Sequence, residues 1–106
     1  MRIYVSQEEL NKKQNKPTLF FHIENPLNLQ NNSEYILSNV SDLSIIFPTE
    51  EFHEVWLKIS TDTNVENINI TFPLDAKWIS SIPTFLPNQT WELSIKNKVI
   101  IAWRVE

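Results

Sequence analysis

The stretch FPLDAKWISSIPTFLPNQTWELSIKNKVIIAW, from Phe72 to Trp103, contains three of the chain's four tryptophans, three of its six prolines and no glycine. Its second half has two apolar runs, at residues 91–95 and 99–103, on either side of Lys96-Asn97-Lys98. In each run apolar side chains recur at every second residue, which is the pattern of a half-buried strand. The stretch therefore predicts a hairpin with a short loop, in which Asn97 takes the positive φ that glycine usually supplies.

The rest of the chain shows the same period of two. The clearest alternation lies between His53 and Ser60, where Val55, Leu57 and Ile59 are expected to face the core. Further apolar runs predict strands at residues 19–24, 34–37, 43–47 and 68–72. About eight short strands with regular turns and no long helical pattern predict an all-β protein, an antiparallel β-sandwich with a short N-terminal arm.

Two segments present the same order of features. EYILSNVSDLSII (residues 34–46) and WELSIKNKVIIAW (residues 91–103) both run from a strand through an Asn-containing turn to a second strand. We therefore expect the first segment to pair as a hairpin as well. Two hairpins of one sandwich look alike by chance, so no internal repeat is inferred.

The length of 106 residues suits one domain. Residues 17–106 are predicted to form a single sandwich domain, preceded by a strand and polar arm over residues 1–16. Leu10 is the only apolar residue of the arm sequence QEELNKKQNK, which is too little for an amphipathic helix. Because the chain has no glycine, asparagine is expected to occupy the left-handed backbone positions.

The net charge of −4 and the pI near 5.1 argue against nucleic acid or an anionic membrane as a partner. No apolar run approaches the roughly 18 residues of a membrane helix, and the first residues are too soon polar for a signal peptide. The absence of cysteine fits a protein made in a reducing cytosol. We expect a soluble chain.

No group of residues has the spacing of a catalytic or metal site. His22 and His53 lie in different predicted strands and are interpreted as ordinary histidines on polar faces. Glu50, Glu51 and Glu54 predict a solvated acidic loop; a small glycosidase using them is the remote alternative. Without glycine there is no phosphate-binding loop. We expect no catalytic residue, no cofactor and no metal.

Several predicted strands are apolar on both faces, whereas a half-buried strand needs only one apolar face. The residues expected to point outward, in a protein–protein interface, are Phe20, Ile46, Trp56, Ile100 and Ala102. Two alternatives remain open. The strands could be central ones covered by loops, or an exposed tryptophan such as Trp56 could form a sugar-binding platform.

The opening stretch resembles the C-terminal signature of small β-modules from bacteriophage structural proteins, such as head fibres, tail fibres and capsid decoration proteins. The matching residues, in order, are Phe72-Pro73, Trp78, Pro83, Pro87-Asn88 and Trp91-Glu92-Leu93-Ser94-Ile95. The match covers about the last third of the chain. It departs from the family at Trp91, where tyrosine is usual, and at Asn97-Lys98, where Asn-Gly is common.

The resemblance implies a stiff lid and hairpin that close the sandwich, built from Phe72, Pro73, Trp78, Pro83, Pro87, Trp91, Asn97 and Trp103. It also implies a non-enzymatic virion protein, made in the host cytoplasm and bound to the capsid exterior. The expected role is that of an auxiliary (decoration) subunit, with the major capsid protein or other virion proteins as partners and with homo-oligomers allowed. The alternative is a head-fibre or tail-fibre adaptor or tip that binds a receptor or glycan.

Overall fold

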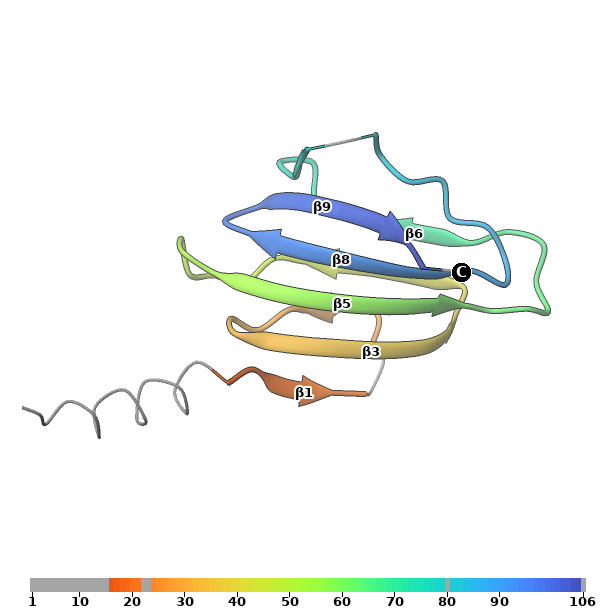
Figure 1. Cartoon of the computed structure of the whole chain (residues 1–106), viewed down its shortest axis with the longest axis horizontal. Helices are drawn as coiled ribbons and strands as arrows, with labels where there is room; N and C mark the ends of the chain where they lie inside the picture. The colour runs from red at the N-terminus through yellow and green to blue at the C-terminus, as the bar shows by residue number, and fades with distance from the viewer. Residues whose placement is uncertain (1–15, 22–23, 80, 106) are drawn as a thin grey trace, which may run out of the picture.

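A computed structural model describes residues 16–21, 24–79 and 81–105. Of the predicted arm over residues 1–16, only Lys16 is among the described residues. His22 also lies outside them. Within the described residues, nine strands form two sheets and there is no helix, which confirms the all-β prediction (Figure 1). The strands are β1 Thr18–Phe20, β2 Leu27–Asn28, β3 Ser33–Val40, β4 Asp42–Ile46, β5 Glu54–Thr61, β6 Asn69–Thr71, β7 Lys77–Trp78, β8 Thr90–Lys96 and β9 Val99–Arg104.

The larger sheet has the strand order β1-β3-β5-β8-β9-β7, and the smaller sheet has the order β2-β4-β6. Figure 1 shows β9, β8, β5, β3 and β1 of the larger sheet one below another, in that order. Only the β5–β8 and β8–β9 pairs are antiparallel; the other five pairs are parallel. The expectation of an antiparallel fold is therefore wrong for most of the ladders.

Four of the five parallel ladders arise because the chain alternates between the two sheets from β1 to β6. The predicted hairpin over residues 34–46 is wrong. Only Ser41 separates β3 from β4, whereas the usual hairpin loops need at least two residues. At this point Asn39 has a φ of 57° and the β3–β5 register shifts between Leu37 and Val40. The chain turns a corner there and enters the other sheet.

One cluster of buried side chains draws on both sheets. Val55, Leu57 and Ile59 of β5 are 0%, 2% and 0% exposed, so their predicted inward orientation is confirmed. Leu37 of β3 and Leu43 of β4 are also fully buried. Truncating a buried leucine of this kind to alanine typically costs about 2–5 kcal/mol of folding free energy. This shared cluster holds the two sheets together.

The β8–β9 hairpin is confirmed, but its loop is one residue shorter than expected. Lys96 pairs with Val99, which leaves Asn97 and Lys98 as the loop. Their φ values of 51° and 72° give the two consecutive positive values of a type I′ turn. Asn97 thus behaves as predicted, and Lys98 stands where glycine is usual.

The shorter loop reverses the predicted orientation of every side chain in β9, because a shift of one residue exchanges the two faces of a strand. Ile100 pairs with Ile95 and is 0% exposed, so its predicted outward orientation is wrong. Ala102 pairs with Leu93 and packs against the core, which corrects its orientation too. Ile101 points away from the core instead and is 45% exposed.

Phe20 was also expected to point outward and does not. It pairs with the buried Tyr35, and the two rings stack with centroids 4.9 Å apart and planes 16° apart. Its neighbours Leu19 and Phe21 are exposed instead. Three consecutive apolar residues carry no alternation, so only the partner strand decides which of them faces inward.

Candidate functional site

The candidate site is the outer face of the larger sheet, the side turned away from the core. Strand pairing sets the positions of its side chains in rows. Trp56 of β5 lies between Glu34 of β3 and Ser94 of β8, and Ser94 pairs in turn with Ile101 of β9. In the next row Glu92 of β8 lies between Lys58 of β5 and Trp103 of β9. The term outer face refers below to Glu34, Trp56, Lys58, Ile79, Glu92, Ser94, Ile101 and Trp103.

One part of the outer face is apolar. Ile79 follows the edge strand β7, and its N–H donates a hydrogen bond to the Ile100 carbonyl at 3.0 Å. Ile79 is 65% exposed, Ile101 and Trp103 are each 45% exposed, and Trp56 is half-buried. We call these four residues the outer patch: Trp56, Ile79, Ile101 and Trp103. Large contiguous apolar patches on a soluble protein usually mark an interaction site.

Two hollows indent the outer face on either side of the small side chain of Ser94. One hollow, of about 300 Å³, lies between Trp56 and Trp103. The other, of about 390 Å³, is lined by Ser94, Val99 and Ile101 among others. Each hollow is large enough to accept side chains from a partner surface. The face is therefore indented as well as apolar.

No ion pair among the described residues neutralises the charges of the outer face. Glu92 accepts a hydrogen bond from the Trp103 indole Nε1–H at 3.1 Å. Lys58 stands directly opposite Glu92, yet among the described residues the only ion pair joins Lys98 to Asp75. Glu34 and Lys58 thus offer one acceptor and one donor beside the tryptophans to an incoming group.

The five predicted interface residues do not lie together. Trp56 belongs to the outer patch. Ile46 is 42% exposed, as expected, but it lies on the outer side of the smaller sheet. Phe20, Ile100 and Ala102 face the core. Ile79 and Ile101 were not predicted as exposed apolar residues, and Trp103 was assigned a structural role. The length of the Asn97 loop accounts for the wrong phase of Ile101 and Trp103 in β9.

The predicted lid residues surround a row of aromatic rings. Trp78 packs against the core and meets Phe72 edge-on, with ring centroids 5.1 Å apart. Phe72 stacks on Phe85 at 6.5 Å, and Phe85 meets Trp91 edge-on at 5.3 Å. We call residues 72–78 and 81–87 the proline loop; Pro73, Pro83 and Pro87 lie in it and are all partly buried.

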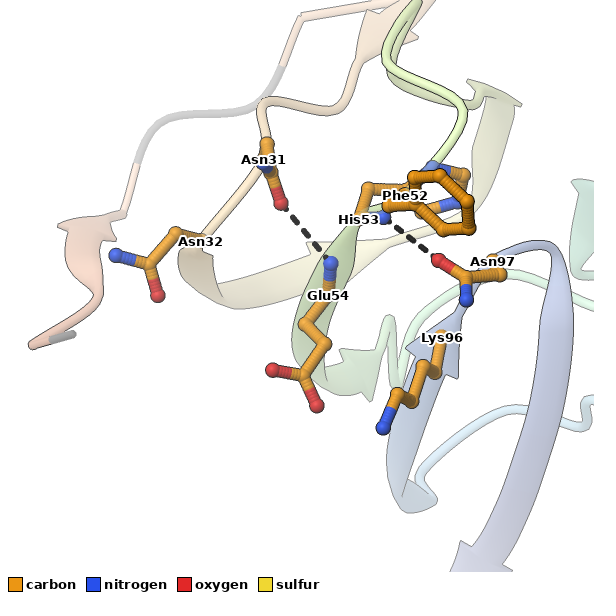
Figure 2. A pocket seen from close by; sticks show the side chains of 7 residues that line it. All are labelled: Asn31, Asn32, Phe52, His53, Glu54, Lys96 and Asn97. Carbon is orange, nitrogen blue, oxygen red and sulfur yellow. Dashed lines mark hydrogen bonds between the residues drawn. The ribbon is translucent and has the colours of Figure 1, made fainter.

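A hollow of about 510 Å³ lies at the tip of the β8–β9 hairpin (Figure 2). Its lining residues are Asn31, Asn32, Phe52, His53, Glu54, Lys96 and Asn97. The backbone N–H of His53 donates a hydrogen bond to Asn97 Oδ1 at 2.7 Å, and the backbone N–H of Glu54 donates one to Asn31 Oδ1 at 3.0 Å. Two asparagine side chains thus hold the start of β5 in place.

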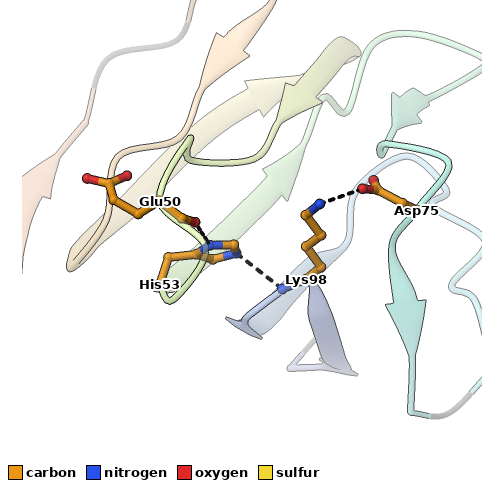
Figure 3. Close-up of polar contacts among 4 residues, drawn as sticks. All are labelled: Glu50, His53, Asp75 and Lys98. Atoms are coloured by element: carbon orange, nitrogen blue, oxygen red, sulfur yellow. Dashed lines mark hydrogen bonds and ion pairs between the residues drawn. The ribbon is translucent and has the colours of Figure 1, made fainter.

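His53 is 3% exposed, which corrects its interpretation as a polar-face histidine. Its Nε2 accepts a hydrogen bond from the Lys98 N–H at 3.1 Å, and its Nδ1 lies 2.8 Å from the Glu50 carbonyl oxygen (Figure 3). Because Nε2 accepts, the hydrogen resides on Nδ1 and is donated to Glu50. The ring therefore makes a contact within the β4–β5 loop through Nδ1 and joins that loop to the hairpin tip through Nε2.

At the same tip, the Lys98 ammonium lies 2.7 Å from Asp75 Oδ2, and both side chains are about half-exposed. The hydrogen bond from Lys98 lowers the pKa of the Asp75 carboxyl below its ordinary value. In the described residues, no three His, Asp or Glu side chains are grouped as a metal ion would require. This end of the molecule is thus bound together by polar contacts that fix the hairpin.

The described part of the chain also contains no helix with the length and apolar character needed to cross a membrane. In comparisons with known proteins, no family model, no curated protein and no solved structure matches this chain.

Proposed function

We propose that the two sheets form a β-sandwich that serves as a non-enzymatic structural module of a phage virion, an auxiliary subunit attached to the capsid exterior. The outer patch is the observation that carries this proposal, since a free-standing chain gains nothing from exposing Trp56, Ile79, Ile101 and Trp103 together. The resemblance of residues 72–103 to phage structural modules supports the choice of partner. The outer face would meet the major capsid protein or another virion protein.

The chemistry of the outer face suits a protein partner. Aromatic and aliphatic side chains at the centre of an interface supply most of its binding energy, with charged residues at the rim. Removing the exposed half of Ile101 or Trp103 from water contributes about 1–2 kcal/mol each. Lys58 and Glu34 are then available to ion-pair across the interface and to fix its orientation.

Binding of the purified chain to capsids from which it has been removed tests the proposal. Ile101→Asp places a charge in the outer patch and should abolish capsid binding, while the far-UV and near-UV circular dichroism stay unchanged. Phe52→Asp is the matched control, because Phe52 is 73% exposed and lies in the loop between β4 and β5. Equal capsid binding by both variants would contradict docking through the outer patch.

A second function is favoured by one observation, the hollow between Trp56 and Trp103 with Glu34 and Lys58 at its sides. Tryptophan rings can stack on the apolar face of a sugar, while a carboxylate and an ammonium bind its hydroxyl groups. The chain would then be an adaptor or tip of a fibre. Glycan-array binding that Trp56→Ala abolishes and Ile79→Asp leaves intact would favour this function over decoration.

A further inference from the structure

The proline loop presents a second apolar surface, separate from the outer face. Leu74 is fully exposed, Ile82 is 66% exposed and Leu86 is 52% exposed. Beside them lies a pocket of about 350 Å³. Its lining residues are Ile70, Thr71, Phe72, Pro73, Leu74, Ala76, Trp78, Ile82, Pro83 and Phe85. A projecting leucine thus stands at the rim of an apolar pocket that is large enough to receive a leucine.

The same surface carries almost no charge. No residue between Trp78 and Trp91 has an ionisable side chain. Of the two ionisable residues in the loop, Asp75 is paired with Lys98, and Lys77 is exposed. Two copies of a chain with a net charge of −4 repel each other over most of their surface. A two-fold interface also brings the same residues of both copies close together, so like charges there would oppose it. An uncharged, apolar surface avoids this cost.

We propose that the proline loop is a self-association surface, on which a second copy of this chain docks with two-fold symmetry. Leu74 of each copy occupies the pocket of the other and packs against its lining residues Phe72 and Trp78. Such an interface is self-complementary, as a two-fold dimer requires, because the projecting side chain and the pocket belong to the same patch. The three prolines already restrict the backbone of the loop, which lowers the entropy lost on association.

The area of the proline-loop surface sets the expected affinity of the dimer. The exposed parts of Leu74, Ile82 and Leu86 with the pocket rim amount to on the order of 500 Å² per copy, below the roughly 800 Å² per partner of a typical stable complex. We therefore expect a dimer that forms in the micromolar to submillimolar range. This inference does not depend on the virion role, since it uses a different face of the molecule.

Sedimentation velocity over a concentration series tests the inference. The wild-type chain should shift from monomer to dimer, and Leu74→Asp should raise the dimer dissociation constant at least tenfold without changing the fold, since Leu74 is entirely on the surface. Phe52→Asp adds the same charge elsewhere and should dimerise as the wild type does. A wild-type chain that stays monomeric up to millimolar concentration would overturn the inference.

A nuclear magnetic resonance experiment locates the contact directly. In an equimolar mixture of ¹³C-labelled and unlabelled chains, intermolecular nuclear Overhauser effects should connect the Leu74 methyl groups with the Trp78 ring. A dimer that lacks these effects would overturn the inference. So would a dimer that Ile101→Asp disrupts while Leu74→Asp does not, and that result would place self-association at the outer patch.

Discussion

Two corners of this molecule look alike in sequence and fold differently. Asn39 follows YILS and Asn97 follows LSIK, and both asparagines adopt the left-handed conformation, with φ of 57° and 51°. At Asn97 the chain reverses into a hairpin within the larger sheet. At Asn39 it leaves that sheet and enters the smaller one. A left-handed asparagine therefore marks a corner and does not determine where the chain goes next.

The neighbours of each asparagine account for the difference. Asn97 is followed by Lys98, also at positive φ, and two such residues close an antiparallel pair. The Asn97 side chain also accepts a hydrogen bond from the backbone N–H of His53. At the other corner Asn39 alone is left-handed among the neighbouring residues. Its side chain makes no hydrogen bond to any residue that the structure describes. One corner is fixed by long-range polar contacts, and the other depends on its backbone conformation and the core on either side.

Asn97→Ala should have the largest effect on this comparison. The change forces a residue with no stabilising side chain into the left-handed region, at about 1–2 kcal/mol, and leaves the buried His53 N–H without its acceptor, at about 1–3 kcal/mol. Urea unfolding should show a loss of about 2–5 kcal/mol. Asn97→Gly removes only the hydrogen bond and should cost about half as much. A cost below 1 kcal/mol for Asn97→Ala would mean that the polar link does not stabilise the corner.

Asn39→Ala should cost less, about 1–2 kcal/mol, because only the backbone preference is lost at this exposed position. Asn39→Gly should leave the unfolding free energy nearly unchanged, since glycine accepts the same conformation and no side-chain contact is removed. Urea unfolding of both variants checks this. If Asn39→Ala proved as costly as Asn97→Ala, the distinction between the two corners would be lost.

Lys98→Gly should stabilise the protein by about 0.5–1 kcal/mol. The change relieves the conformational cost of a side chain at a φ of 72°. Two smaller effects oppose this gain: the loss of the exposed ion pair to Asp75 and the greater conformational entropy of glycine in the unfolded chain. Thermal unfolding should show a higher midpoint. A lower midpoint would indicate that the Lys98 side chain contributes more through Asp75 than its exposure suggests.

Asp75→Asn should have the smallest effect, and the effect should depend on pH. The pKa of Asp75 is lowered from 3.8 in the folded protein, so its ion pair stabilises the folded state fully above that value. The contribution disappears as the pH falls through the folded-state pKa. Wild type should therefore exceed Asp75→Asn slightly in stability at pH 7, and the difference should vanish as the pH falls through the folded-state pKa. A difference that does not change with pH would contradict the role of Lys98.

The sequence predicts much of the fold where alternation is clear. The strand from His53 onward and the inward side chains of β5 follow from Val55, Leu57 and Ile59 alone. The left-handed asparagines also follow from the absence of glycine: Asn32, Asn39, Asn88 and Asn97 all have positive φ. These features depend on neighbours in the sequence, which the chain itself displays.

Features that depend on distant strands could not be predicted. The orientation of β9 requires the length of its loop, and Lys98 in place of glycine concealed a two-residue turn. The orientation of Phe20 depends on its pairing with Tyr35, and the parallel ladders depend on the corner at Asn39. β2 and β7, with two residues each, are too short to show a period. As a result, the outer patch was assigned to the wrong residues of β9.

The claim that most needs a direct test is that the outer patch attaches this chain to a capsid. Quantitative mass spectrometry of purified phage virions would measure its copy number relative to the major capsid protein. The account predicts copies comparable to those of the capsid subunit, and their loss when the phage carries Ile101→Asp. A copy number as low as that of vertices or a single tail, or absence of the chain from virions, would contradict it.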